Sequence, residues 1–220
     1  MSNVTRLVLG VWLAVSTALA ADAGLSGLLK AVEQRYNHAK TLQVLFEQQY
    51  TARGRHRVEA GELRLRKPGR MRWQYSNPAG KLFLSDGKFV YFYSPAANRV
   101  EKSKLKETED LRAPLAFLLG KLNFEHDFGA FQSTPQGSDT VIVARARNDR
   151  LPYTEVEFTV TPQHSIRHLV VRGTDQSVME YTFSDEKLNP ALDDALFRFH
   201  MPPGAEFVES LDEDQRTPQP

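Results

Sequence analysis

The sequence contains no cysteine among its 220 residues. An exported protein without cysteine has no disulfide framework, so its fold must depend on an apolar core. The absence also removes the thiol that an N-terminal lipid would require, so we expect a protein without a lipid anchor.

Motifs of the common enzyme classes are missing as well. The sequence has no G-x-S-x-G, no H-E-x-x-H and no glycine-rich phosphate loop. His164 and His168 are four residues apart, but they flank a strand pattern, so we expect no metal site there. Residues 125–127, Glu-His-Asp, are interpreted as a solvated loop rather than a catalytic cluster. We therefore expect a binding protein that is not an enzyme and uses no cofactor.

The N-terminus has the layout of a secretory signal peptide. Arg6 precedes the apolar run Leu7–Ala20, and the last three residues of that run, Ala-Leu-Ala, match the A-x-A cleavage rule. An uncleaved anchor is the alternative, but a spanning helix needs about 20 apolar residues. We expect residues 1–20 to be a cleaved signal peptide. Their removal takes away one base and leaves equal numbers of acidic and basic residues in a mature protein free in solution.

Residues 21–208 are expected to form one domain, because about 200 residues suit a single undivided sheet protein. Residues 209–220 are polar, acidic and proline-containing, which predicts a disordered tail.

Apolar residues change period after the first helix. A stripe at helical spacing, with Leu25, Leu29 and Tyr36, predicts a helix, and alternation begins at Leu42. A second helix is predicted over residues 114–119. The expected strands are residues 42–50, 63–66, 71–75, 82–84, 89–93, 141–143, 156–160, 166–171, 179–183 and 197–199. Tight turns between them predict one large curved antiparallel sheet whose concave face is covered by the helices.

Eight basic residues lie between Arg53 and Arg72, against two acidic ones, Glu59 and Glu62. Export excludes nucleic acid as their partner. Arg64 and Arg66 alternate with apolar residues, which favours a solvated strand face. The alternative is a patch that meets an acidic partner or lipid headgroups.

Several motifs resemble the LolA family, the periplasmic carriers of outer-membrane lipoproteins, across nearly all of the expected mature chain. Gly61-Glu62-Leu63 with Lys67-Pro68 and Trp73 is similar to a G-x-L…(R/K)-P…W segment of that family. The other matching segments are Leu84–Lys88 with Tyr91-Phe92-Tyr93 and Pro95, Pro114 with Leu118-Leu119, and Phe197-Arg198-Phe199 with Pro202-Pro203-Gly204.

The resemblance implies a mainly β protein with helices (α+β), an incomplete antiparallel β-barrel, or half-barrel, with a helical lid over its concave face. Its apolar interior would take the acyl chains of triacylated lipoproteins. An inner-membrane ABC-type exporter would load the carrier, which we expect to be a monomer, and an outer-membrane lipoprotein receptor would unload it. In the family an arginine before the turn proline holds the lid shut. Here that position is Lys67, which offers a point charge in place of a planar fork.

Nine residues are the candidates for the lipid-binding cavity, with ordinary core packing as the alternative for each: Leu28, Val32, Phe46, Met71, Trp73, Tyr75, Phe83, Phe117 and Leu118. Lys67 is the candidate lid latch, or else a simple turn residue. Periodicity leaves open which face of residues 82–84 points inward, since all three are apolar.

A lipid or lipoprotein sensor of the same fold, acting through a regulatory partner, is the alternative function. A lipid-anchored receptor would need a cysteine. The two-domain sensors that share the fold have a second domain, for which about 200 residues leave no room.

Overall fold

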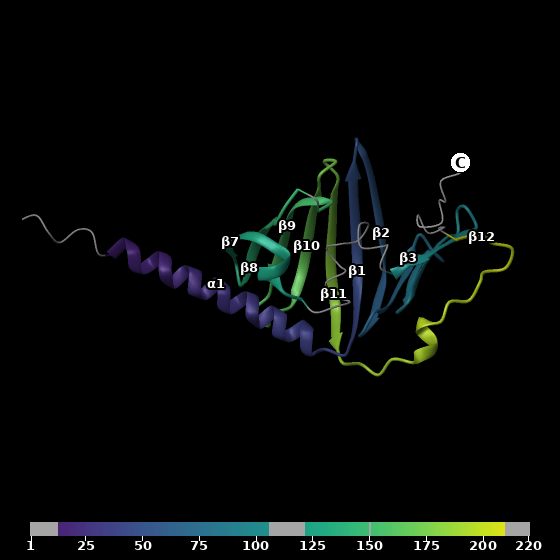
Figure 1. The fold of residues 1–220 in the computed structure, drawn as a ribbon, viewed down its shortest axis with the longest axis horizontal. Helices are drawn as coiled ribbons and strands as arrows, with labels where there is room; N and C mark the ends of the chain where they lie inside the picture. The colour runs from purple at the N-terminus through teal and green to yellow at the C-terminus, as the bar shows by residue number, and fades with distance from the viewer. Residues whose placement is uncertain (1–12, 106–121, 150, 210–220) are drawn as a thin grey trace, which may run out of the picture.

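The structure is a computed structural model that describes residues 13–105, 122–149 and 151–209 (Figure 1). Its main element is a twelve-stranded sheet formed by these residues. The strands are β1 Thr41–Ala52, β2 Arg55–Arg66, β3 Arg70–Asn77, β4 Leu82–Asp86, β5 Phe89–Ser94, β6 Arg99–Lys104, β7 Phe128–Gln136, β8 Asp139–Ala146, β9 Tyr153–Val160, β10 Ile166–Gly173, β11 Val178–Leu188 and β12 Glu206–Glu209. The helices are α1 Leu13–His38, α3 Phe124–Asp127 and the 3-10 helix η2 Asp194–Phe197.

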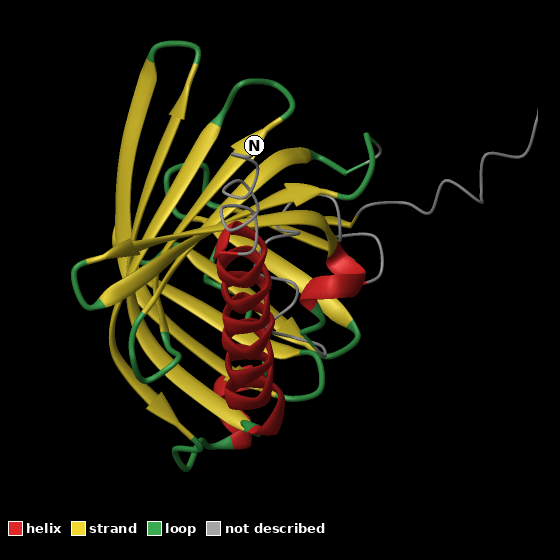
Figure 2. Ribbon diagram, turned by 90° about the vertical axis from the view of Figure 1, so that its left-hand side faces the viewer, coloured by secondary structure: helices red, strands yellow, loops and turns green. Residues whose placement is uncertain are grey.

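The sheet is open and almost entirely antiparallel. Its strand order is β12-β6-β5-β4-β3-β2-β1-β11-β10-β9-β8-β7, so β1 joins two meanders at the centre. The exception is β12, which pairs in parallel with β6. β12 and β7 are the two outer strands, and the described chain does not close them into a barrel. Figure 2 shows the strands curving around α1. The predicted half-barrel is confirmed.

α1 lies against the concave face because one side of it is apolar. Leu29, Val32 and Tyr36 repeat at three- and four-residue intervals, and all three are buried in the core. The helix begins at Leu13, earlier than the apolar stripe indicated, so the predicted cleavage point after Ala20 lies within it. The second predicted helix, residues 114–119, lies outside the described residues.

Alternation along β1 decides which side chains enter the core. Leu42, Val44 and Phe46 are buried, whereas Leu45 on the opposite face is exposed to solvent over about 42% of its surface. In β2, Gly61 occupies a concave-face position where a side chain would not fit. A Cβ there would stand 2.3 Å from the Gln74 carbonyl oxygen. This close approach explains why the first position of the G-x-L segment is a glycine.

The predicted strand over residues 197–199 is wrong. The chain there leaves the 3-10 helix η2, whose N-terminus is capped by the Asp193 side chain accepting a hydrogen bond from Ala195 N. Residues 125–127, expected as a loop, belong to the short helix α3, capped by Asn123. β6, β7 and β12 were not predicted, and Glu209, the first residue of the predicted tail, ends β12.

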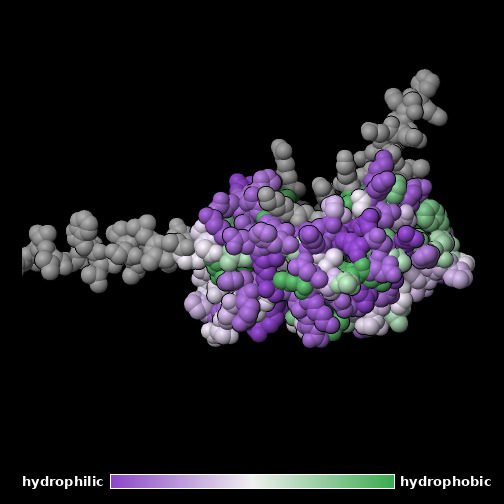
Figure 3. Space-filling model, turned by 90° about the horizontal axis from the view of Figure 1, so that it is seen from below, coloured by the Kyte–Doolittle hydropathy of each residue, from purple (hydrophilic) through white to green (hydrophobic). Residues whose placement is uncertain are grey.

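No helix in the described part of the chain combines the length and the apolar character that a membrane span requires. Seen from below the view of Figure 1, the described surface is mostly hydrophilic, and hydrophobic side chains form small patches on it (Figure 3).

Candidate functional site

The candidate site is the apolar wall on the concave face of the sheet, the face on which α1 also lies (Figure 2). Phe46, Met71, Trp73, Tyr75 and Phe83 are all buried in one cluster. They come from β1, β3 and β4, and the antiparallel register places Trp73 opposite Phe83. The wall therefore brings together the five strand residues proposed from the sequence.

The α1 candidates also reach this cluster. Val32 is fully buried in it, and Leu28 is partly buried and packs against it. Phe117 and Leu118 lie outside the described residues. The described wall residues and the α1 residues are buried in one cluster, so acyl chains could reach the wall only if part of this packing opened. Their role as a cavity lining stays a prediction.

Register decides which way residues 82–84 face. Phe83 pairs with Trp73 and belongs to the concave cluster. Leu84 points to the opposite face, where η2 packs against β3 and β4, and is buried there. Both residues are therefore buried, on different sides of the sheet.

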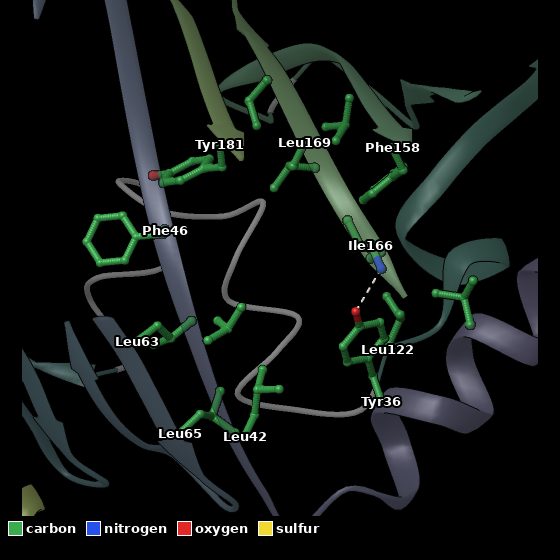
Figure 4. Close-up of a cluster of buried hydrophobic side chains, with 14 of the residues drawn as sticks. Tyr36, Leu42, Phe46, Leu63, Leu65, Leu122, Phe158, Ile166, Leu169 and Tyr181 are labelled. Atoms are coloured by element: carbon green, nitrogen blue, oxygen red, sulfur yellow. Dashed lines mark hydrogen bonds between the residues drawn. The ribbon is translucent and has the colours of Figure 1, made fainter. Parts of the chain in front are cut away.

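Aromatic rings form the centre of the wall. The Phe46 ring contacts Trp73 edge-on, with centroids 4.7 Å apart, and Tyr75 at 5.2 Å. Trp73 also approaches Tyr181 of β11, and Figure 4 shows Phe46 and Tyr181 facing the same interior. The Trp73 Nε1 atom is buried and has no hydrogen-bond partner among the residues that the structure describes.

Lys67 contacts the end of α1. Its Nζ donates a hydrogen bond to the Tyr36 carbonyl oxygen at 2.6 Å. Burial lowers the pKa of Lys67. The last carbonyls of a helix lack intrahelical partners and attract cations, so Lys67 makes the kind of contact that the latch hypothesis requires.

A second group holds the same end of α1 on the other half of the sheet. The Tyr36 hydroxyl donates to Glu186 Oε2 at 2.8 Å and accepts from Ile166 N at 2.8 Å (Figure 4). Arg35 Nη2 lies 2.5 Å from Glu186 Oε1. Burial, together with the neighbouring Glu186 carboxylate, raises the pKa of Tyr36 and keeps its phenol neutral. The C-terminal end of α1 is thus fixed to both halves of the sheet.

α1 is also tied to the segment that leads into α3. The Asn37 side chain donates to the Leu122 carbonyl oxygen at 2.8 Å and accepts from Leu122 N at 2.7 Å. Phe124 N donates to Glu33 Oε1 at 2.7 Å. These three hydrogen bonds join residues 122–124 to α1. If this part of the helix moves, residues 122–124 must move with it or the three bonds must break.

The basic stretch meets an acidic group of its own chain. Arg66 and Arg70 both pair with Asp194 of η2, Arg70 at 3.0 Å. Arg72 donates to the Leu196 carbonyl oxygen at 3.1 Å. These arginines bind the C-terminal segment to the convex face, so the solvated-face interpretation does not hold for them. No local pattern indicated this partner, because it lies more than 120 residues away.

His164 and His168 do not form a shared site in the described structure. His164 occupies a turn with positive φ, and His168 Nε2 lies 2.8 Å from Glu180 Oε1. Within the described ranges, no three residues of the metal-binding types are close enough to hold an ion.

Comparison with known proteins assigns the chain to a family. Residues 37–200 match the family model described as outer membrane lipoprotein carrier protein LolA. The chain belongs to the LolA family. This match spans β1 to β11 and extends past η2, so it includes the strand part of the wall, Lys67 and Glu186.

Individual relatives agree with this assignment. The outer-membrane lipoprotein carrier protein of Nitrosomonas europaea is 27% identical over 182 residues, which cover 82% of this chain and 88% of that protein. That of Chromobacterium violaceum is 25% identical over 197 residues, or 89% and 93% of the two chains. The crystal structure of an uncharacterized conserved protein from Thermus thermophilus matches with a TM-score of 0.51 at 13% identity, covering 85% of this chain and 99% of that one. The last similarity concerns the fold alone.

Proposed function

We propose that this LolA-family protein is a periplasmic chaperone for lipoproteins. It binds the acyl chains of triacylated lipoproteins released from the inner membrane and delivers them to an outer-membrane receptor. An inner-membrane ABC-type exporter loads it. The protein acts by binding alone, as a monomer without catalysis or a cofactor, after residues 1–20 have directed its export.

The observation that carries the proposal is an apolar wall on the concave face that shares one buried cluster with a helix whose end is held by a few polar contacts. Val32 of α1 is buried in the same cluster as the wall, while Lys67 and Glu186 hold the helix end from the two halves of the sheet. Such a cover can separate from the wall without unfolding of the sheet.

A carrier needs the apolar wall to bind an acyl chain, and it needs the helix to limit the affinity so that the chain can be released. Each buried methylene contributes about 0.8 kcal/mol, so one acyl chain of about a dozen methylenes contributes on the order of 10 kcal/mol. A permanently open apolar groove would hold such a chain too tightly to release it. Opening the cover costs free energy that subtracts from the affinity, and this makes transfer to a receptor possible.

Mass spectrometry of material bound to the protein purified from its native periplasm tests the proposal. Copurified triacylated lipoproteins would support it. A free lipid or a regulatory membrane protein in their place would favour the sensor alternative and contradict the carrier role.

A further inference from the structure

The concave face of the β1–β2 hairpin changes from apolar to cationic along its length. Side chains alternate, so the even residues of β1 and the odd residues of β2 share this face. From one end of the hairpin to the other, the facing pairs are Leu42–Leu65, Val44–Leu63, Phe46–Gly61, Gln48–Glu59, Tyr50–Arg57 and Ala52–Arg55. Apart from Gly61, the residues of the first three pairs are buried in the same cluster as the wall. The last three pairs are a separate feature, here called the polar end.

The polar end lies at the opposite end of the hairpin from the fixed end of α1. Lys67, which holds that helix end, follows β2 directly, at the Leu42–Leu65 end. At the other end β2 extends past β3, whose pairing with it stops at Ala60. Residues 55–59 therefore pair with β1 alone, and the hairpin rises above the neighbouring turns in Figure 1.

A buried ion pair marks the boundary between the apolar wall and the polar end. Glu59 is 3% exposed, and its Oε2 lies 2.5 Å from Lys81 Nζ. Its Oε1 lies 3.3 Å from Arg57 Nε. Desolvation of a carboxylate is costly unless it is paired, and here two cations share it. Lys81 Nζ also lies 4.3 Å from the centroid of the Tyr75 ring, so the pair adjoins the aromatic wall.

Positive charge exceeds negative charge at this end. Arg55, Arg57 and Lys81 are opposed by Glu59, the sole acidic residue on this face of the described hairpin. The Arg57 side chain is 61% exposed, and its guanidinium lies over the Tyr50 ring at 5.7 Å. This contact keeps Arg57 on the concave side, beside the apolar wall.

We infer that the polar end holds the head of an acylated ligand, and that Arg55 and Arg57 favour ligands whose head carries a phosphate or carboxylate. The inference rests on the proposed function, because the acyl chains would occupy the apolar wall. They would point toward the Leu42–Leu65 pair, with the head at the hairpin tip. The guanidinium fork matches both anions through paired hydrogen bonds.

The test compares ligands that differ in head charge alone. Calorimetric titration of the delipidated protein with lysophosphatidylglycerol and lysophosphatidylcholine of one chain length, below micelle formation, gives an affinity ratio. The expected ratio is about fivefold in favour of the anionic lipid, the size of partly exposed charge interactions. It should shrink in high salt. The same comparison is made with two N-palmitoyl peptides that carry either glutamate or glutamine in the head. Their affinity ratio measures the preference for a carboxylate, and it shows whether the preference extends from phospholipids to acylated peptides.

The double variant Arg55→Gln/Arg57→Gln should lower both ratios to about one. Arg145→Gln/Arg198→Gln is the matched control. It removes the same charge from two exposed positions away from the concave face of the hairpin, and it should keep the wild-type ratios. Equal binding of both head types by the wild-type protein, or unchanged ratios in the Arg55/Arg57 variant, would overturn the inference. Failure to bind any acylated ligand would instead refute the proposed function.

Discussion

Replacing Lys67 by leucine should weaken closure of α1 over the apolar wall. The substitution removes the donor to the Tyr36 carbonyl oxygen, now 2.6 Å from Nζ. A hydrogen bond from a charged group contributes about 1.5–3 kcal/mol. Lys67 is only partly buried, so solvent screening places the value near the lower limit. A loss of about 1.4 kcal/mol changes the ratio of open to closed protein roughly tenfold.

The remaining contacts of the helix end limit the effect. Tyr36 and Arg35 still bind Glu186 in the variant, and Ile166 N still donates to the Tyr36 hydroxyl. We therefore expect a folded protein that opens more often, and not one that has lost α1. Because closure competes with the ligand, affinity for a fluorescent acyl probe should rise by up to about tenfold and release should slow.

Probe titration, stopped-flow release and hydrogen exchange at the end of α1 measure these changes. Exchange near Tyr36 should become faster to a similar extent, because its rate follows local opening. Lys67→Arg is the matched control, since arginine keeps a donor at the same position. If affinity, release and exchange in Lys67→Leu all equal those of the wild-type protein, Lys67 is a turn residue and no latch.

The other predictions concern the wall, the contact between Tyr36 and Glu186, and the close backbone approach at Gly61. Trp73→Glu should abolish acyl-probe binding while circular dichroism still reports the sheet, because the carboxylate would lie in the apolar wall; normal loading would remove Trp73 from the lining. Glu186→Ala should lower stability to denaturant by about 1–3 kcal/mol, since it leaves the buried Tyr36 hydroxyl without its acceptor; an unchanged midpoint would contradict this role. Gly61→Ala should cost about 1–3 kcal/mol through overpacking against Gln74, a loss that denaturant titration would detect.

Local periodicity was enough to predict much of the fold. The alternation from Leu42 and the helical stripe through Val32 appear in β1 and α1 as expected. The same alternation identified Phe46 and Trp73 as inward-facing, because side-chain direction in a strand follows from position alone. Lys67 could be singled out as well, through the turn motif and the resemblance to the LolA family.

The tertiary structure decided which distant groups meet. Only register shows that Phe83 and Leu84 are buried on opposite faces, and only folding brings Asp194 to Arg66 and Glu186 to Tyr36. These contacts join residues more than 120 positions apart, and each depends on how the whole sheet curves. Periodicity reports the environment of a side chain over a few residues. It carries no information about which remote partner supplies that environment.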